Sequence, residues 1–132
     1  LRAAVLYQRQ GFGKSIVVGR ESDVRQRLEA AGLGDAAGEL EVVNAANTEH
    51  LEDYKNYLYQ RLQRKGFDTT DVHRLAARDR HVFGSLMLAH GHGDGLVTGV
   101  TRNFSIALEE VRRGEIIDAK TIIGLQWVRD LL

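Results

Sequence analysis

The sequence predicts an α/β fold with three layers, α/β/α, in which helices cover both faces of a mostly parallel sheet. Short runs rich in β-branched residues alternate with longer segments whose apolar residues recur every three or four positions. The chain of 132 residues is 43% hydrophobic and 27% charged, which fits one globular domain with a real core. We therefore expect residues 1–132 to form a single domain.

The first half of the chain predicts a helix–strand–helix–strand order. Residues 1–10 favour a helix and residues 15–19 a buried strand. A second helix should follow, capped by Ser22 or Asp23 and ended by Gly32 or Gly34. The second strand is expected at residues 39–44. The apolar residues expected to pack on the two helices are Ala4, Leu6 and Tyr7 on the first, and Val24, Leu28 and Ala31 on the second.

The second half predicts several helices and a third strand. A helix over residues 51–64 carries apolar side chains at spacings of three and four, and Gly66 should stop it. Residues 69–71 should cap a helix that runs to Arg78. An apolar helix over 82–90 has small residues that permit close packing. A glycine-rich turn at 91–95 should follow it, and then a strand at 96–99. Those small residues are Gly84, Ser85 and Ala89.

Charge and composition exclude several classes of protein. The 18 basic and 18 acidic side chains give a formal net charge of zero, so no overall field draws the chain to nucleic acid or to a membrane surface. The absence of cysteine excludes disulfides and thiolate catalysis within these residues and is compatible with a cytoplasmic protein. No apolar run approaches the roughly 18 residues of a membrane-spanning helix. The start at Leu1, which lacks a methionine, predicts a fragment.

Ligands of open parallel sheets bind beyond the carboxyl ends of the strands. Three segments follow predicted strands, at residues 19–22, 44–48 and 99–103. The third combines Gly99, where a ligand could approach the backbone, with three polar side chains, Thr101, Arg102 and Asn103. Because free amides at the start of a helix favour an anion, this segment predicts a phosphate or carboxylate contact. The alternative is a polar loop that caps the helix beginning at Ser105.

Three other polar segments are weaker candidates for ligand binding. The stretch 78–81, which includes Arg80, is either a second anion site or a solvated junction with internal ion pairs. Residues 90–94 hold two histidines and an aspartate, but their spacing matches no zinc signature, so a helix end and a turn are the preferred interpretation. Residues 11–14 lack the spacing of a phosphate-binding loop.

One long segment resembles a known family. Residues 84–99, GSLMLAHGHGDGLVTG, are similar to the phosphate acetyltransferase pattern G-x-[LM]-[LM]-x-x-x-G-x-A/G-D-[AG]-L-[VI]-[SCT]-G. Residues 16–20 and 40–44 are similar to the family's first two strands. The stretch 99–112 resembles the branch found at the end of bacterial NADP-dependent malic enzymes, as do residues 7–11 and 66–68. The resemblance covers about residues 1–118.

This resemblance implies one lobe of a two-lobed α/β domain. In the transferases, the cleft between the lobes moves an acetyl group between CoA and phosphate. In the malic-enzyme fusions, the similar domain is thought to bind acetyl-CoA as a regulator and to help form homo-oligomers. An earlier strand and most of the second lobe are expected outside the chain, and residues 119–132 are expected to be a non-contiguous segment.

The chain departs from active transferases at two places. They carry H-[ST]-[ST] after the third-strand glycine and an Arg-Pro pair in the next helix, whereas this chain has Arg102-Asn103-Phe104 and then Glu109-Glu110. Glutamate repels phosphate, which argues against transferase activity, so we expect no catalytic residue in the chain. The resemblance implies that the dehydrogenase domain, with its metal and NADP sites, lies outside the chain, so we expect neither a metal nor a cofactor in the chain itself. The resemblance implies that the parent enzyme binds NADP and a divalent metal, Mg or Mn. A catalytic transacetylase lobe and a purely structural oligomerisation domain remain alternatives.

Overall fold

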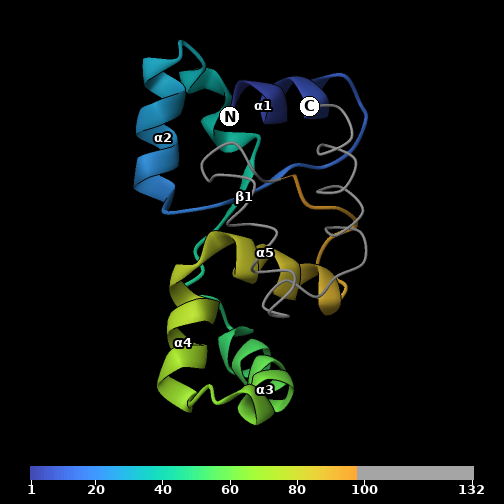
Figure 1. Cartoon of the computed structure of the whole chain (residues 1–132). Coiled ribbons are helices and arrows are strands. Elements are labelled where there is room, and N and C mark those ends of the chain that lie inside the picture. The colour runs from blue at the N-terminus through green and yellow to red at the C-terminus, as the bar shows by residue number, and fades with distance from the viewer. Residues whose placement is uncertain (98–132) are drawn as a thin grey trace, which may run out of the picture. The chain divides into compact units, whose positions relative to one another are not determined.

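The computed structural model describes residues 1–97, and these residues belong to two compact units. The first unit is Leu1–Thr48 and the second begins at Glu49. Helices make up most of the described chain, and two strands pair in parallel (Figure 1), so the predicted α/β class is confirmed. None of the helices in residues 1–97 has both the length and the apolar character needed to cross a bilayer.

The first unit alternates helices and strands in the predicted order. Its elements are α1 (Arg2–Arg9), β1 (Ile16–Val18), α2 (Glu21–Ala30), the 3₁₀ turn η1 (Gly34–Gly38) and β2 (Glu41–Val43). The two strands are parallel neighbours, with Ile16 opposite Glu41 and Val18 opposite Val43. Parallel strands need a crossover between them, and here α2 and η1 supply it.

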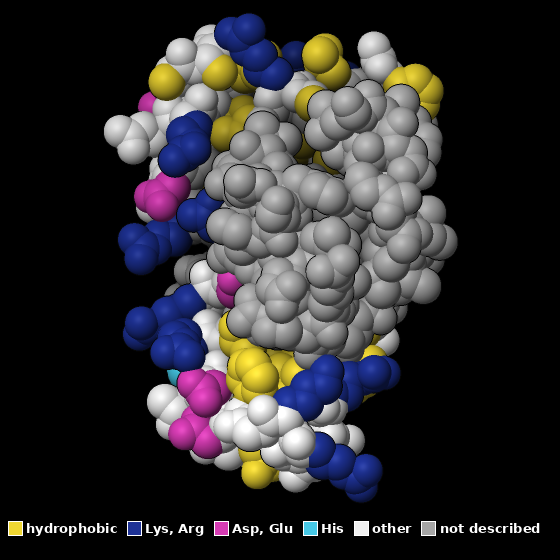
Figure 2. Space-filling model, viewed as in Figure 1, with side chains coloured by type: hydrophobic (Ala, Val, Ile, Leu, Met, Phe, Trp, Pro, Cys, Tyr) yellow, Lys and Arg dark blue, Asp and Glu magenta, His cyan; other side chains and the backbone are white. Residues whose placement is uncertain are grey.

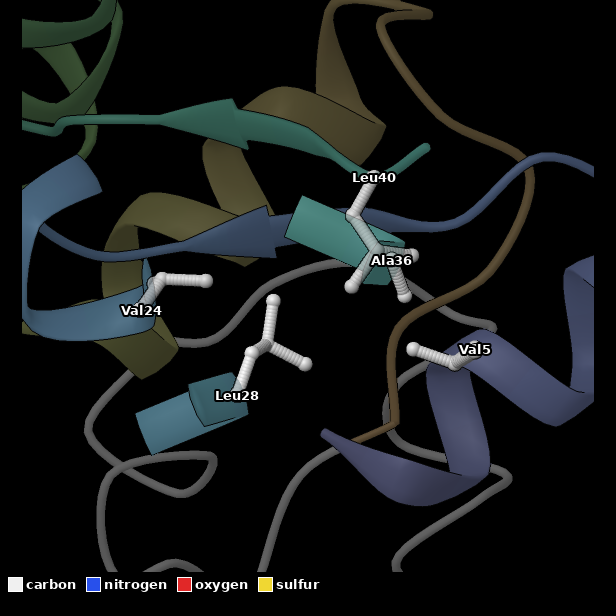
Figure 3. Packing of buried hydrophobic residues seen from close by; sticks show 5 residues of the cluster. All are labelled: Val5, Val24, Leu28, Ala36 and Leu40. Carbon is white, nitrogen blue, oxygen red and sulfur yellow. The ribbon is translucent and has the colours of Figure 1, made fainter. Parts of the chain in front are cut away.

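A small apolar core holds the first unit together. Five buried side chains from α1, α2, η1 and the approach to β2 converge (Figure 3): Val5, Val24, Leu28, Ala36 and Leu40. Val17 and Val42 of the strands pack against this cluster and remain partly exposed. The prediction that Val24 and Leu28 face the core is therefore confirmed, because residues four apart lie on one face of a helix.

The buried face of α1 differs from the prediction. Leu6 and Tyr7 are 57% and 47% exposed, whereas Val5 is 1% exposed. The inward side of α1 also carries Gln8, whose amide donates to Glu39 O at 2.6 Å and accepts from Ser15 N at 2.9 Å. Hydrogen bonds to distant segments therefore orient this helix, and an apolar count along its sequence could not reveal them.

The start of α2 also corrects a prediction. The helix begins at Glu21 and its N-cap is Arg20, which makes no side-chain capping bond, so neither Ser22 nor Asp23 is the cap. Both residues lie inside the first turn instead, where Asp23 and Glu21 complement the positive end of the helix dipole. The helix ends at Ala30, and Gly32 follows with φ of +70°, the left-handed conformation that glycine adopts without strain.

In the described residues, the second unit is helical. Its elements are α3 (Leu51–Leu62), the 3₁₀ turn η2 (Gln63–Lys65), α4 (Thr69–Arg78) and α5 (Arg80–Ala89), and the three α-helices pack against one another (Figure 1). Gly66 ends the α3–η2 segment with φ of +88°, as predicted. The helices bury these apolar side chains: Tyr54, Leu58 and Leu62 of α3, Val72 and Ala76 of α4, and Val82, Phe83, Leu86 and Met87 of α5.

Aspartates cap both helices after η2. Asp68 accepts from Asp71 N at 2.8 Å, and the side chain of Asp71 accepts in return from Asp68 N at 3.4 Å, which completes a capping box for α4. The cap is therefore one residue earlier than the predicted 69–71. Asp79 separates α4 from α5 and caps the latter by accepting from His81 N at 2.9 Å and Val82 N at 3.3 Å.

The apolar helix α5 is buried over most of its circumference, as its composition predicts. A Cβ at Gly84 would lie 2.8 Å from Leu96 Cδ1, so the expected close approach at this glycine is confirmed. Ser85 is also buried and donates to His81 O at 2.9 Å, whereas Ala89 is exposed. Leu96 and Val97 are not in a strand, and the rest of the strand predicted at 96–99 lies outside the described residues.

Candidate functional site

The carboxyl ends of β1 and β2 bring two of the three predicted segments together. Both strands run in the same direction, and Gly19 N donates to Val43 O at 2.9 Å immediately beyond them. The segments 19–22 and 44–48 therefore begin at one edge of the sheet. This is the edge where open parallel sheets bind ligands, so the expected location is confirmed for these two segments.

The first of these segments leads into the amino-terminal end of α2. Arg20 is exposed and provides no side-chain cap, which leaves the first amides of the helix to solvent or to a ligand. Glu21 and Asp23 already place negative charge in this turn, and Arg25 pairs with Glu21 at 2.9 Å. These carboxylates weaken the attraction of the helix end for an anion.

The second segment is a closed turn. Asn44 Oδ1 accepts from Ala46 N at 3.1 Å, and Asn44 O accepts from Asn47 N at 3.1 Å. Asparagine side chains commonly form such hydrogen bonds to the nearby backbone in turns. Asn44 therefore shapes the backbone here, and its side-chain oxygen is already engaged.

The third segment carried most of the predicted ligand contacts. Gly99, Thr101, Arg102 and Asn103 lie outside the described residues, so their predicted role stays a prediction. The chain leading to them is described as far as Val97, whose side chain is 98% exposed.

The structure places the remaining predicted site residue, Arg80, at the first position of α5. Its side chain is exposed, and the neighbouring Asp79 carboxylate accepts hydrogen bonds from the helix amides that an anion would need. An anion at this helix end would meet a carboxylate that already occupies the position. Arg80 could contact a ligand only through its guanidinium, and that role stays a prediction.

The first unit has a shallow depression of about 320 Å³ on its surface. Its lining residues come from α1 and from the segment that follows α2: Arg2, Val5, Leu6, Arg9, Ala31 and Leu33. Both cations there have partners, since Arg2 donates to Ala31 O at 3.2 Å and Arg9 bonds Asp35 and Glu39 at 2.8 and 2.7 Å. The depression therefore does not offer a free cation to an anionic ligand.

Arg9 is the centre of an exposed ionic network that joins α1 to η1 and the residue after it. Hydrogen bonds from its guanidinium lower the pKa of Asp35 and of Glu39 below their usual values. The same bonds raise the pKa of Arg9. Elsewhere on the face drawn in Figure 2, dark-blue basic side chains lie among magenta acidic ones within the coloured part of the surface.

A cluster of rings in the second unit was not predicted. His50 and Tyr54 of the α3 end meet His90 and His92, which follow α5. The ring centroids of His50 and His92 are 4.1 Å apart, and those of Tyr54 and His90 are 4.7 Å apart. Tyr54 Oη lies 2.5 Å from His92 Nδ1. Burial, with a smaller contribution from the charge of Asp53, raises the pKa of Tyr54 to about 12.

The sequence indicates the ring residues of α3 by their spacing, but it does not indicate their partners in this cluster. Positions 50, 54, 57 and 61 recur at helical spacing, and Arg61 lies 4.9 Å from the centroid of the Tyr57 ring. His92 is 38 residues from Tyr54 in the sequence, so only the packing of α5 on α3 brings these rings together. His90 ends α5 and Gly91 turns with φ of +77°, so the predicted helix end and turn are confirmed.

Residues 90–94 hold two histidines and an aspartate, which are side chains of the types that bind metal ions. Within residues 1–97, no group of three or more His, Asp or Glu side chains has a geometry that could hold a metal ion. His90 Nδ1 lies 2.8 Å from Leu86 O and must donate to that carbonyl, which leaves only Nε2 as a coordinating atom.

Comparison with known proteins identifies the family. Residues 1–124 match the family described as phosphate acetyl/butaryl transferase. The chain belongs to this family. The match extends past residue 118, where the resemblance recognised in the sequence ended, and includes the first part of the segment 119–132.

Several relatives of this phosphate acetyl/butaryl transferase domain are malic enzymes. The chain is 45% identical over 114 residues to an NADP-dependent malic enzyme of Rhizobium meliloti and 35% identical over 111 residues to a probable NADP-dependent malic enzyme of Rickettsia prowazekii. These alignments cover 86% and 84% of the chain but only 15% and 14% of the two relatives. The predicted resemblance to the transferase-like domain of malic enzymes is therefore confirmed.

A phosphate acetyltransferase is also among the relatives. The protein of Acetivibrio thermocellus is 30% identical over 103 residues, which cover 78% of the chain and 30% of the relative. The lower identity agrees with the departures from the transferase pattern at 102–104 and 109–110.

Proposed function

We propose that this chain is a non-catalytic domain of an NADP-dependent malic enzyme, and that it senses acetyl-CoA or a related acyl-CoA and helps the enzyme form homo-oligomers. The observation that carries the proposal is a combination of similarities. The chain belongs to a transferase family, yet its 45% identity to a malic enzyme exceeds its 30% identity to a phosphate acetyltransferase. Acyl-CoA is the class of ligand expected for a transferase-like domain in such an enzyme.

The parent enzyme would oxidise and decarboxylate malate to pyruvate with NADP and a divalent metal, Mg or Mn, in the cytoplasm. In this proposal, the chain itself holds neither the NADP nor the metal, and it binds neither nucleic acid nor a membrane. Thr101, Arg102 and Asn103 would contact a phosphate or pantetheine group, with Gly99 allowing close approach and Arg80 as a further cation. Regulation then requires that acyl-CoA bind two states of the enzyme with different affinity.

Titration calorimetry tests the sensing role on the intact parent enzyme. We expect acetyl-CoA to release or absorb heat on binding and to change the rate of malate oxidation. Arg102→Ala should weaken both effects, because it removes the proposed phosphate contact. Arg64→Ala removes another arginine, exposed and not part of the proposed site, and as the matched control should leave both unchanged. Absence of binding heat together with an unchanged rate would contradict the proposal and favour a purely structural oligomerisation domain.

A catalytic lobe of a phosphate acetyltransferase is the second candidate. It is supported by the 30% identity to the Acetivibrio protein and by the family match over residues 1–124. Acetyl phosphate formation from acetyl-CoA and phosphate measures this activity directly. Robust turnover that Arg102→Ala abolishes would establish the transferase and overturn the non-catalytic assignment.

A further inference from the structure

The exposed apolar side chains of the described chain gather around its first helix. Within residues 1–97, five large hydrophobic side chains are exposed, and four of them belong to α1, the residue before it or the turn after it: Leu1, Leu6, Tyr7 and Phe12. Phe12 is 67% exposed. Single exposed apolar residues are common on protein surfaces, whereas a group of them marks a surface that contacts another molecule or segment.

Local contacts hold the two rings of this group in place. The ring centroids of Tyr7 and Phe12 are 5.7 Å apart. Gly11 turns the chain with φ of +75°, and Phe12 N then donates to Tyr7 O at 3.2 Å. A Cβ at Gly13 would lie 3.1 Å from Tyr7 Cε1, so the tyrosine ring lies directly over this glycine. Because the rings are already ordered, a partner that covers them takes little conformational freedom from them.

The cations of α1 next to these apolar side chains are paired within the first unit. Arg2 donates to Ala31 O at 3.2 Å, and Arg9 bonds Asp35 and Glu39 at 2.8 and 2.7 Å. Nucleic acids and anionic lipid surfaces are attracted by unpaired Lys and Arg side chains, which neutralise their phosphates. The chemistry around the rings therefore fits an apolar partner better than a charged one.

The size of the exposed group favours a partner on the same polypeptide. Leu6, Tyr7 and Phe12 together expose on the order of 300 Å², since a large aromatic side chain has about 150–250 Å². A stable complex of separate molecules buries about 800 Å² on each partner. Interfaces between domains of one polypeptide start at about 600 Å² in all, or roughly 300 Å² from each side. The chain aligns with only 15% and 14% of two malic-enzyme relatives, so a parent of such length has ample polypeptide to supply the covering face.

We propose that the Tyr7–Phe12 ring pair is the docking site for an apolar face of the parent polypeptide outside residues 1–132. The two rings form the centre of the contact, and Leu1 and Leu6 lie at its rim, where side chains contribute little to binding energy. The proposal rests on the part of the proposed function that places this chain in a larger enzyme. It does not depend on acyl-CoA binding, so the two ideas can fail separately.

Photo-crosslinking of the intact parent enzyme tests the docking site without any ligand. Phe12 is replaced by p-benzoylphenylalanine, which keeps an aromatic ring at this position. Mass spectrometry of the digested product identifies the linked peptide, which we expect to come from outside residues 1–132. Denaturing electrophoresis shows whether the link joins one polypeptide to itself, which keeps the mass of one subunit, or joins two copies, which doubles it. We expect the mass of one subunit.

The same probe at Gln26, an exposed polar residue of α2, is the matched control. The yield of the link from position 12 should exceed the yield from position 26 severalfold. The docking site is refuted if the two yields are equal, if the links from position 12 stay within residues 1–132, or if they join two copies. Titration with acetyl-CoA is independent of this outcome: a crosslinked parent that binds no acetyl-CoA would lose the sensing role and keep the docking site.

Discussion

In the first unit, the charged side chains that join distant segments are exposed, whereas in the second unit rings with a buried centre make such contacts. Arg9, 39% exposed in its side chain, ties α1 to Asp35 and Glu39. Tyr54, 1% exposed, ties α3 to His92. Exposed ion pairs contribute little because water solvates both charges well and salt screens them. A buried hydroxyl left without a hydrogen-bond partner is costly. The Tyr54–His92 contact should therefore contribute more to stability than the ion pairs of Arg9 do.

The helix N-caps also differ between the two units. α2 in the first unit begins at Arg20 with no side-chain cap, whereas α4 and α5 in the second unit begin with aspartates that accept from backbone amides. The first unit instead gains order from its apolar cluster and the parallel pairing of β1 with β2. Local sequence therefore specifies the starts of α4 and α5 more strongly than that of α2, whereas α3 begins at His50 without a side-chain cap.

The largest expected effect tests whether the two cores are independent. Leu28 in the first unit and Leu58 in the second are both fully buried, so Leu28→Ala and Leu58→Ala should each cost about 2–5 kcal/mol of stability. Denaturant unfolding measures the cost, and hydrogen exchange shows where protection falls. Each substitution should loosen its own unit, and Leu6→Ala, which truncates an exposed side chain, should change stability by less than about 0.5 kcal/mol. Equal loosening of both units by either change would show a single cooperative core.

The second-largest expected effect is a loss of folding stability at alkaline pH, caused by Tyr54 in the second unit. Because burial raises the pKa of Tyr54 to about 12 from 10.0, the folded state keeps the phenol proton over a range where the unfolded state has lost it. The stabilisation is complete below pH 10 and is lost as pH rises from 10 to 12. Unfolding in denaturant at a series of pH values should show this loss in the wild type and a smaller one in Tyr54→Phe. Tyr59→Phe, on the same helix, is the matched control and should keep the wild-type slope.

The smallest expected effect compares the caps directly. Asp68→Ala removes the α4 capping box and should destabilise by about 0.5–2 kcal/mol, while Asp68→Asn, which keeps an acceptor, should cost less. Arg20→Ser should instead stabilise α2 by up to about 1 kcal/mol, since it adds a cap where none exists. Thermal unfolding measures all three. A loss of stability in Arg20→Ser would show that the arginine has a role beyond the helix start.

The sequence by itself determined the element order of the described chain. Apolar spacing located α3 and its buried Tyr54, Leu58 and Leu62, because that periodicity is a local property of the helix. Runs of β-branched residues located β1 and β2, because such side chains favour strands. The motif at 84–99 also indicates the family, and the match over residues 1–124 confirms it. The contacts predicted for 99–103 stay predictions.

Tertiary structure alone decided which side chains meet across the chain. Leu6 and Tyr7 turn outward because Gln8 bonds Ser15 and Glu39, seven and 31 residues away. His92 forms a hydrogen bond with Tyr54 because α5 packs on α3, although 38 residues separate the two. Periodicity reports which face of a helix is apolar, but the partner of a polar side chain depends on how distant segments pack. That packing gives the second unit its ring cluster.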